Sequence, residues 1–194
     1  MKIKESGMPD REIWEGFFSP ASILKTLQIN KNIKDVVEFG CGYGTFTIPA
    51  TQVIRGNLFA FDIEPEMVAT TKKEALVKGV KNIKVIVRDL MADGTGLKPG
   101  IVDYVMLFNI LHLDNPIILL HEANRILSNK GKIGIIHWNY DPSTPRGPSM
   151  DIRPKPEQCI ELAYQAGFVN PKQFDLKPYH YGIVMSKKIT NKHY

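Results

Sequence analysis

The sequence predicts an α/β domain in which a mostly parallel, doubly wound sheet carries helices on both faces. Three observations predict this fold. Five short apolar runs alternate with segments of helical spacing, the first run leads into a glycine-rich turn, and two further strand-like stretches follow near the C-terminus. Strands that alternate with helices favour a parallel sheet, because each connection crosses back over it. The last two stretches are expected to close the sheet as an antiparallel pair.

The composition is that of a single soluble globular domain: 194 residues, of which 43% are hydrophobic and 23% charged. No apolar run is long enough to span a bilayer, and the start lacks the apolar stretch of a signal peptide, so a cytoplasmic location without a membrane partner is expected. The net charge of +5 permits a nucleic-acid partner without requiring one. Cys41 and Cys159 lack metal-ligand spacing, so we expect free thiols and no metal.

Two N-terminal helices are expected before the first strand, at residues 10–15 and 20–27. Pro9 introduces the first helix, and Ser19 is a candidate N-cap for the second. The first helix and the residues after it carry large aromatic side chains, among them Trp14 and Phe17. These two residues either pack in the core or line a substrate pocket.

The first strand, about 35–39, leads into a turn that contains Gly40, Gly42 and Gly44. Glycine is needed where a backbone turns tightly or where a ligand approaches it closely. The spacing is neither that of a dinucleotide site nor that of a P-loop. Glu38, just before the turn, would repel a pyrophosphate but suits a cationic ligand. A helix over about 45–54 is expected to follow.

The run Glu-Phe-Gly-Cys-Gly-Tyr-Gly at residues 38–44 resembles motif I (E/D-x-G-x-G-x-G) of the class I S-adenosylmethionine-dependent methyltransferases. This resemblance implies a Rossmann-like sheet with an antiparallel last strand, and S-adenosylmethionine as cofactor. It also implies that Glu38 faces the cationic side of the cofactor and that the start of the next helix faces its carboxylate. The motif residues expected to bind the cofactor are Glu38, Gly40, Cys41, Gly42 and Gly44. A tight turn without a ligand is the alternative.

The second strand, 58–63, ends in Asp62 and Ile63, about twenty residues after the glycine turn. An acid at this place in a nucleotide-binding sheet accepts hydrogen bonds from ribose hydroxyls, because an ionised carboxylate is only an acceptor. The alternative role for Asp62 is to cap the next helix, expected over 65–78. We therefore count Asp62 and Ile63 among the cofactor-binding residues.

The third strand, 83–87, leads to Asp89 and Leu90. By the family resemblance, the Asp89 side chain would accept the adenine amino group, and the Leu90 backbone N–H would meet a ring nitrogen. Alternatively, Asp89 is a turn residue or forms an ion pair with Arg88.

The fourth strand, 102–108, is followed by Asn109 and His112. Asp103, at the start of this strand, lies far from the ligand edge and is expected to be structural. Asn109 lies at that edge, where it could reach the methionine part of the cofactor, and His112 follows at the same mouth. A helix over 116–127 and a turn at 129–131 come next.

The fifth strand, 132–138, ends at Trp138, Asn139 and Tyr140. Family members commonly meet substrate at this strand end, so the resemblance makes these three residues candidates for the substrate pocket. The proline-rich stretch 141–156 cannot be helical and is either a binding lid or a linkage without function. A helix over 156–166 precedes the closing strands.

The resemblance covers about residues 34–187. It predicts a methyltransferase domain over 34–194 preceded by a helical lid segment over 1–33, together forming a single domain. The implied reaction is in-line transfer of a methyl group from S-adenosylmethionine. His112 is the candidate base, because a histidine with an ordinary pKa near 6.5 suits that task; a pocket-lining or core histidine is the alternative.

The methyl acceptor is expected to be a small molecule, because the lid segment and the proline-rich loop suggest a closed pocket. Two other functions stay open, an RNA or protein methyltransferase and a non-catalytic S-adenosylmethionine- or nucleotide-binding protein. The sequence does not indicate the oligomeric state.

Overall fold

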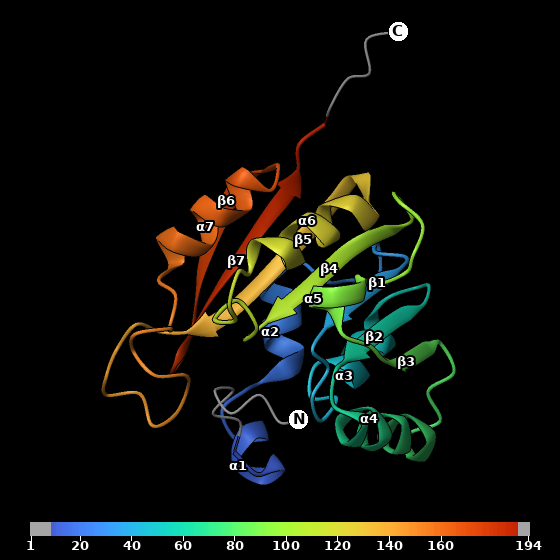
Figure 1. The fold of residues 1–194 in the computed structure, drawn as a ribbon. Coiled ribbons are helices and arrows are strands. Elements are labelled where there is room, and N and C mark those ends of the chain that lie inside the picture. The colour runs from blue at the N-terminus through green and yellow to red at the C-terminus, as the bar shows by residue number, and fades with distance from the viewer. Residues whose placement is uncertain (1–8, 190–194) are drawn as a thin grey trace, which may run out of the picture.

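The computed structural model describes residues 9–189, which form one seven-stranded sheet in the order β3-β2-β1-β4-β5-β7-β6 (Figure 1). The first five strands run parallel, and β7 pairs antiparallel with both β5 and β6. This arrangement confirms the predicted mostly parallel sheet with an antiparallel last strand. The strands are β1 (Val36–Phe39), β2 (Leu58–Asp62), β3 (Ile83–Val87), β4 (Val102–Phe108), β5 (Leu127–Trp138), β6 (Phe168–Leu176) and β7 (His180–Lys187).

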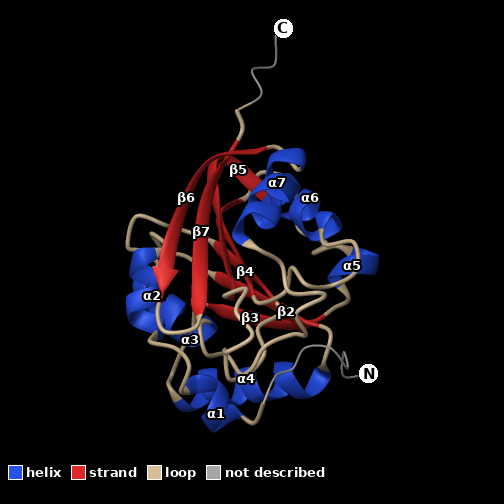
Figure 2. Cartoon of the chain, turned by 90° about the vertical axis from the view of Figure 1, so that its left-hand side faces the viewer, coloured by secondary structure: helices blue, strands red, loops and turns tan. Residues whose placement is uncertain are grey.

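Helices cover both faces of the sheet, as a doubly wound fold requires (Figure 2). One layer contains α2 (Pro20–Thr26), α3 (Thr47–Val53) and α4 (Pro65–Val77). The other contains α5 (Leu90–Asp93), α6 (Ile117–Ile126) and α7 (Pro156–Gln165). The short helix α1 (Arg11–Glu15) lies near α4, at the end of the sheet where the loops gather (Figure 2).

The strand β1 shows how the sheet divides the core. Val37 and Phe39 belong to the cluster shared with α6 and α7, whereas Val36 belongs to the cluster shared with α2, α3 and α4. Side chains alternate between the faces of a strand, so Glu38 must enter the same apolar layer as Val36. All four residues are buried. A carboxyl group in such a layer is costly to fold, and therefore suggests a functional role.

The strand order creates a crevice beside β1. The chain leaves β1 toward β2 and β3 on one side, and it returns to β4 on the other side. The two directions separate between β1 and β4, at the carboxyl ends of the parallel strands. Open α/β sheets bind ligands at this kind of topological switch point.

Several predicted boundaries were wrong. The helix after the glycine turn begins at Thr47, two residues later than predicted, and it ends before Gly56, whose N–H donates to the carbonyl of Lys34. The turn predicted at 129–131 lies inside β5, which starts at Leu127. Ser19 occupies the N-cap position of α2 but makes no side-chain cap.

Two surface positions are settled by their contacts. Asp103 accepts a hydrogen bond from the Lys34 N–H at 2.8 Å, which confirms its structural role. Lys187 donates to the carbonyls of Asn124 and Leu127 at 2.7 Å each. It therefore satisfies carbonyls at the C-terminal end of α6, where a cation is favourable.

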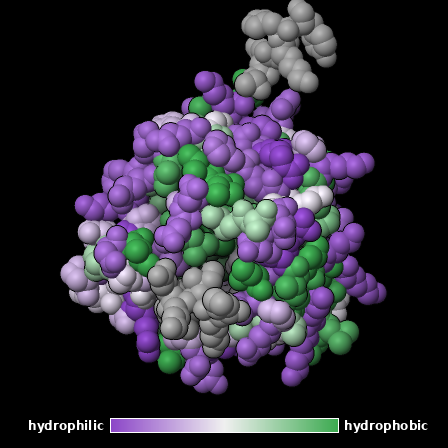
Figure 3. Space-filling model, viewed as in Figure 1, coloured by the Kyte–Doolittle hydropathy of each residue, from purple (hydrophilic) through white to green (hydrophobic). Residues whose placement is uncertain are grey.

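The surface is mainly polar. In Figure 3 hydrophilic residues surround separate apolar patches, several of them near the middle of the face shown. Within residues 9–189, no helix is both long enough and apolar enough to cross a membrane.

Candidate active site

A cavity opens at the carboxyl ends of β1, β2, β3 and β4, in the crevice described above. Its lining contains twelve of the residues predicted from the sequence, namely Trp14, Glu38, Gly40, Cys41, Gly42, Asp62, Ile63, Asp89, Leu90, Asn109, His112 and Trp138. The predicted residues Gly44, Phe17, Asn139 and Tyr140 are not among those that line it.

The glycine turn forms the floor of the cavity in a conformation that requires glycine. Gly40, Gly42 and Gly44 have φ angles of +76°, +51° and +80°. The Thr71 hydroxyl donates to the carbonyl of Gly42 at 3.0 Å, which ties the turn to α4. A Cβ on Gly44 would lie only 3.1 Å from that same hydroxyl. Gly44 thus shapes the turn by packing against α4, and the ligand-facing glycines are Gly40 and Gly42.

Glu38 is the most perturbed acid of the site. Its side chain is 2% exposed and accepts a hydrogen bond from the Thr47 hydroxyl. Burial raises the pKa of Glu38 from 4.5 to about 8, although the Thr47 bond acts in the opposite direction. A cation beside this carboxyl would favour its ionised form. The structure therefore contains a buried group whose charge depends on what occupies the cavity.

Asp62 is held by backbone on two sides. The N–H of Gly42 donates to Oδ2 at 2.8 Å, and the N–H of Glu64 donates to Oδ1 at 3.0 Å. Burial is the main cause that raises the pKa of Asp62, and the two backbone bonds oppose it. The N-cap position of α4 belongs to Glu64, so Asp62 does not cap that helix. Each carboxylate oxygen can accept a further hydrogen bond from the cavity.

Asp89 caps α5. Its Oδ1 accepts from the N–H groups of Met91 and Ala92 at 2.9 and 3.1 Å. The alternative ion pair with Arg88 is not formed, because the Arg88 guanidinium donates to the carbonyls of Gly94 and Asp93. Both cap bonds use Oδ1, so Oδ2 remains for a ligand. The adenine contact is still a prediction.

Two buried polar side chains of the cavity have no hydrogen-bond partner within residues 9–189. They are the amide of Asn109 and the hydroxyl of Thr45. Asn109 adopts a φ of +54°, and its N–H donates to the Ile136 carbonyl at 2.8 Å, which fixes this turn against β5. Buried polar groups are nearly always bonded, so these two indicate a polar ligand. The sequence analysis did not identify Thr45, which lies one residue past the motif.

His112 is 8% exposed and lines the cavity from the turn after β4. Its Nδ1 lies 3.3 Å from Nε2 of His137, and its own Nε2 has no partner within the described residues. Burial lowers the pKa of His112 to about 4, below the ordinary value assumed from the sequence. The ring is thus neutral at pH 7 and can accept a proton.

Several large aromatic side chains line the cavity. Trp14, Phe46, Phe108 and Trp138 line it, and the rings of Phe46 and Phe108 lie 4.9 Å apart, edge to face. Phe17 stands behind this wall and packs on Trp138 at 5.2 Å. Phe17 therefore supports the cavity wall without lining the cavity. Of the two roles expected for it, core packing and lining a substrate pocket, this position agrees with packing.

Asn139 and Tyr140 lie beyond the strand end on a separate hollow, which they share with Phe174. The Lys155 ammonium lies 4.6 Å from the Tyr140 ring centroid. The resemblance placed both residues at the substrate, because they follow the right strand. Of the three residues predicted at this strand end, only Trp138 lines the cavity.

The N-terminal segment is tied down over the cavity. The Arg11 guanidinium bonds Glu74 of α4 at 2.7 Å, and the Tyr43 hydroxyl donates to the Pro9 carbonyl at 3.2 Å. Trp14, three residues after Arg11, lines the cavity. The placement suits the predicted lid over 1–33, although residues 1–8 lie outside the described part and the lid role stays a prediction.

Arg153 organises the proline-rich loop, and the sequence analysis did not identify it. Its side chain is 6% exposed and donates to backbone carbonyls of Asn139, Asp141, Arg146 and Pro148. Pro148 lines the cavity, so this loop contributes to the wall. One buried arginine among many in a basic chain gives no sequence signal of this role.

The two cysteines are buried free thiols, as predicted. Within residues 9–189, no group of three or more histidine, cysteine, aspartate or glutamate side chains could hold a metal ion.

Comparison with known proteins identifies the fold and the family. A family model described as a methyltransferase domain matches residues 36–131. The aklanonic acid methyltransferase DauC of Streptomyces sp. (strain C5) is 31% identical over 122 residues, which are 60% of this chain and 54% of DauC. The chain thus spans about half the length of this curated relative.

Solved structures share the fold. A SAM-dependent methyltransferase from Aquifex aeolicus superposes with a TM-score of 0.80 at 21% identity, over 91% of this chain and 93% of the other. The tRNA (m1A58) methyltransferase TrmI from Aquifex aeolicus has a TM-score of 0.66 at 18% identity, over 89% and 70%. At these identities the likeness shows the fold alone.

Proposed function

This chain belongs to the class I S-adenosylmethionine-dependent methyltransferases, and from that premise we propose that it methylates a small, largely apolar acceptor. One observation carries the proposal. One cavity is lined by glycines and acids from the first three strands and the segments that follow them, and by apolar side chains, Asn109 and the neutral His112 from β4 onward. Such a cavity suits a charged sulfonium nucleoside beside an uncharged partner.

The polar end of the cavity fits the cofactor. Asp62 would accept hydrogen bonds from the ribose hydroxyls, and Glu38 would face the positive charges of the methionine part. The unpaired side chains of Thr45 and Asn109 offer donors and acceptors to the same part. Asp89 would contribute its free carboxylate oxygen, and Leu90 its backbone, to adenine.

The cofactor supplies a methyl group on a positively charged sulfur, which is a good leaving group. The protein therefore mainly aligns the acceptor behind the methyl carbon and excludes water. His112 faces the acceptor end and is neutral at pH 7, so its Nε2 could take the proton that a hydroxyl acceptor must lose. Its low pKa makes it a weak base, which fits a proton transfer that follows attack on the methyl carbon.

The chemistry of the wall supports an apolar acceptor. Trp14, Phe46, Phe108 and Trp138 offer flat apolar surfaces, and no acid is among the described residues that line the cavity from β4 onward. The relative DauC is named for a small organic acid, aklanonic acid. Its substrate is a guide to the class of acceptor and does not identify the acceptor of this chain.

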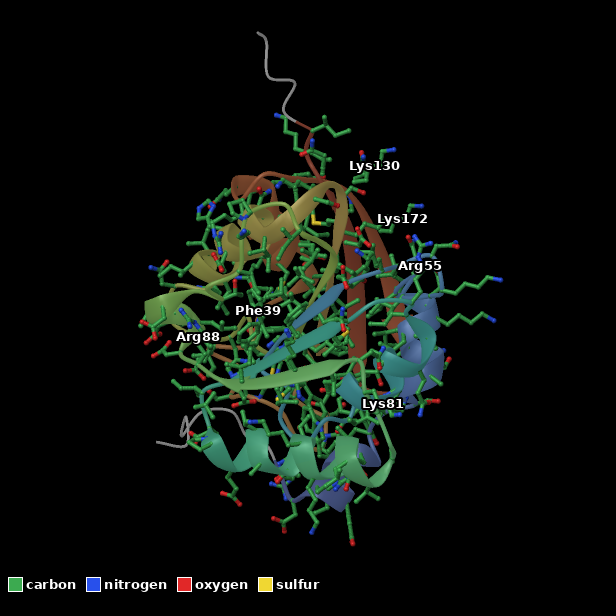
Figure 4. All side chains as sticks on the ribbon, turned by 90° about the vertical axis from the view of Figure 1, so that its right-hand side faces the viewer. Phe39, Arg55, Lys81, Arg88, Lys130 and Lys172 are labelled. Atoms are coloured by element: carbon green, nitrogen blue, oxygen red, sulfur yellow. The ribbon has the colours of Figure 1, made fainter. Side chains whose placement is uncertain are left out.

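The alternative of an RNA acceptor has some support from the net charge of +5. The labelled cations Lys130, Lys172, Arg55 and Lys81 lie along one side of the molecule, whereas Arg88, which lines the cavity, lies on the opposite side (Figure 4). Lys81 and Arg55 precede β3 and β2, so they lie near the amino ends of those strands. These cations are therefore poorly placed to guide RNA into the cavity.

Two measurements test the proposal. Calorimetric titration with S-adenosylmethionine, S-adenosylhomocysteine and NAD should show binding of the first two only. A panel of neutral phenols, aromatic carboxylic acids, transfer RNA and histone peptides should then give S-adenosylhomocysteine with the aromatic small molecules. Turnover with the RNA or the peptide alone would overturn the small-molecule proposal. Binding without turnover across the panel would favour a non-catalytic binder.

A further inference from the structure

We propose that His137 is a positioning residue for His112. His137 accepts a hydrogen bond from the Nδ1–H of His112, and the lone pair of His112 Nε2 then faces the methyl acceptor. This inference deepens the proposed function and rests on it. No sequence pattern indicates a role for His137, because it lies within an apolar run that forms a buried strand.

The two rings meet in the geometry of a hydrogen-bonded pair. The Nε2 of His137 lies 3.3 Å from the Nδ1 of His112, and the rings cross at 74° with centroids 5.5 Å apart. His137 is completely buried, whereas His112 lines the cavity. The contact thus joins an interior side chain to one that can touch a ligand.

His137 is held more firmly than the residue it contacts. It lies in β5, which is paired on both sides, and its register partner on β7 is Tyr181. The Tyr181 ring stacks on the His137 ring with centroids 6.3 Å apart. His112, by contrast, belongs to the turn after β4. A fixed strand residue can therefore set the orientation of a loop residue, as outer partners do for metal-bound histidines.

Counting protons leaves two arrangements of the pair. Two neutral imidazoles carry two N–H groups, and one of these lies in the bond between them. The other is either on His112 Nε2 or on His137 Nδ1. Neither outer nitrogen has a hydrogen-bond partner within the described residues.

The pair stays neutral at pH 7. Burial lowers the pKa of both rings, and for His137 the neighbouring His112, His180 and the Arg153 guanidinium lower it further. A charge formed on His112 would therefore not pass to His137. The inner ring acts as a hydrogen-bond acceptor and does not act as a second base.

The proposed role of His112 selects between the two arrangements. His112 Nε2 can take a proton only if it carries a bare lone pair, so the proton of His112 must be on Nδ1. Nε2 of His137, 3.3 Å away, then accepts that Nδ1–H, and the proton of His137 is on its own Nδ1.

This tautomer matches the reaction. An electron pair of X forms the bond to the methyl carbon, and the X–H bond then breaks as its proton moves to His112 Nε2. The pair of the broken C–S bond goes to sulfur, which becomes neutral. The imidazolium of His112 returns its proton to water when the products leave.

The proposal is tested without turnover by nitrogen NMR on protein labelled with ¹⁵N-histidine at pH 7.5, with S-adenosylhomocysteine bound. A His112→Asn variant assigns the His112 signals. In the parent, Nδ1 should appear as N–H and Nε2 as a bare nitrogen. His137→Phe, which keeps a ring of similar size, should give a mixture of both tautomers. A parent His112 with Nε2–H, or an unchanged tautomer in His137→Phe, overturns the proposal.

Kinetics with the best acceptor of the panel provide a second readout. His137→Phe should lower kcat about 10-fold or more, with an acceptor KM within about twofold of the parent. His137→Gln should recover part of kcat, because its amide oxygen can accept the His112 Nδ1–H. Tyr181→Phe is the matched control: it keeps the ring stack, loses the hydroxyl bond to the Pro154 carbonyl, and should leave kcat unchanged.

An equal loss of kcat in His137→Phe and Tyr181→Phe would show a merely structural effect and would overturn the proposal. Failure of the proposed function gives a different result, namely no methyl transfer by the parent with any small acceptor. The tautomer measurement is valid in that case too, so the two failures can be told apart.

Discussion

Replacing Glu38 with glutamine should stabilise the ligand-free protein at neutral pH while weakening its cofactor binding. The two side chains have nearly the same shape, and the Thr47 hydroxyl can bond either. Glu38 has a pKa near 4.5 when exposed and about 8 when folded, because burial disfavours its charge. Between pH 4.5 and about 8, the folded state therefore binds more protons than the unfolded state. Stability due to Glu38 must fall as pH rises through that window.

The magnitude follows from the two pKa values. Each pH unit inside the window costs about 1.4 kcal/mol, so the Glu38 contribution should fall by about 2.5 kcal/mol between pH 5.5 and 7.5. Glutamine does not titrate. The difference in unfolding free energy between Glu38→Gln and the parent should therefore grow in favour of the variant by that amount.

Urea denaturation of both proteins at pH 5.5, 6.5 and 7.5 measures this difference. His112 and His180, whose pKa values burial lowers, add a pH dependence of opposite sign, but both proteins share it and it cancels. The reasoning is refuted if the difference stays constant with pH or shrinks. Calorimetry adds a second check: S-adenosylmethionine should release a proton from the parent near pH 7 and none from the variant.

Three other changes test the site. Asp62→Ala should weaken S-adenosylmethionine binding tenfold or more in calorimetry while the protein stays folded, since a lost hydrogen bond to a charged group costs about 1.5–3 kcal/mol. An unchanged Kd would show that Asp62 does not bind the ribose. Arg11→Ala should change the free energy of unfolding by less than about 1 kcal/mol, because the ion pair with Glu74 is partly exposed. If the segment is a lid, the same variant should release the cofactor faster in stopped-flow, and Glu74→Gln should do the same. An unchanged release rate in both variants would show that the contact is only a surface ion pair. Arg153→Met should expose the loop at 141–154 to limited proteolysis, because several carbonyls lose their donor; equal protease resistance would contradict that role.

Much of the fold and the cofactor end of the site could be predicted because both follow from local patterns. The apolar runs that became β3 and β4 were predicted with the same bounds as observed. Glu38, Asp62, Asp89 and Asn109 each follow or end a predicted parallel strand, and strands of one parallel sheet end at the same edge. The order of the strands is therefore enough to bring these four residues together in one cavity.

Other predictions failed where packing overrode a local signal. Gly131 resembled a turn residue, but β5 runs through it, and the pairing with β4 shifts register between Leu127 and Lys132. Asn139 and Tyr140 were placed at the substrate by their position after a strand, and the loop carries them to another hollow. Their direction depends on Arg153, twelve or more residues further along the chain, which no local pattern reports.

The sequence by itself determined the sheet, the glycine turn and the acids beside it, because each depends on neighbours along one short segment. Only the tertiary structure decided the protonation and orientation of the groups at the acceptor end. The pKa values of Glu38 and His112 depend on burial by several elements, and the contact of His112 with His137 joins the turn after β4 to β5, 25 residues further along the chain. Charge and hydrogen bonding in an interior are set by everything that surrounds a group, and a one-dimensional pattern does not contain that information.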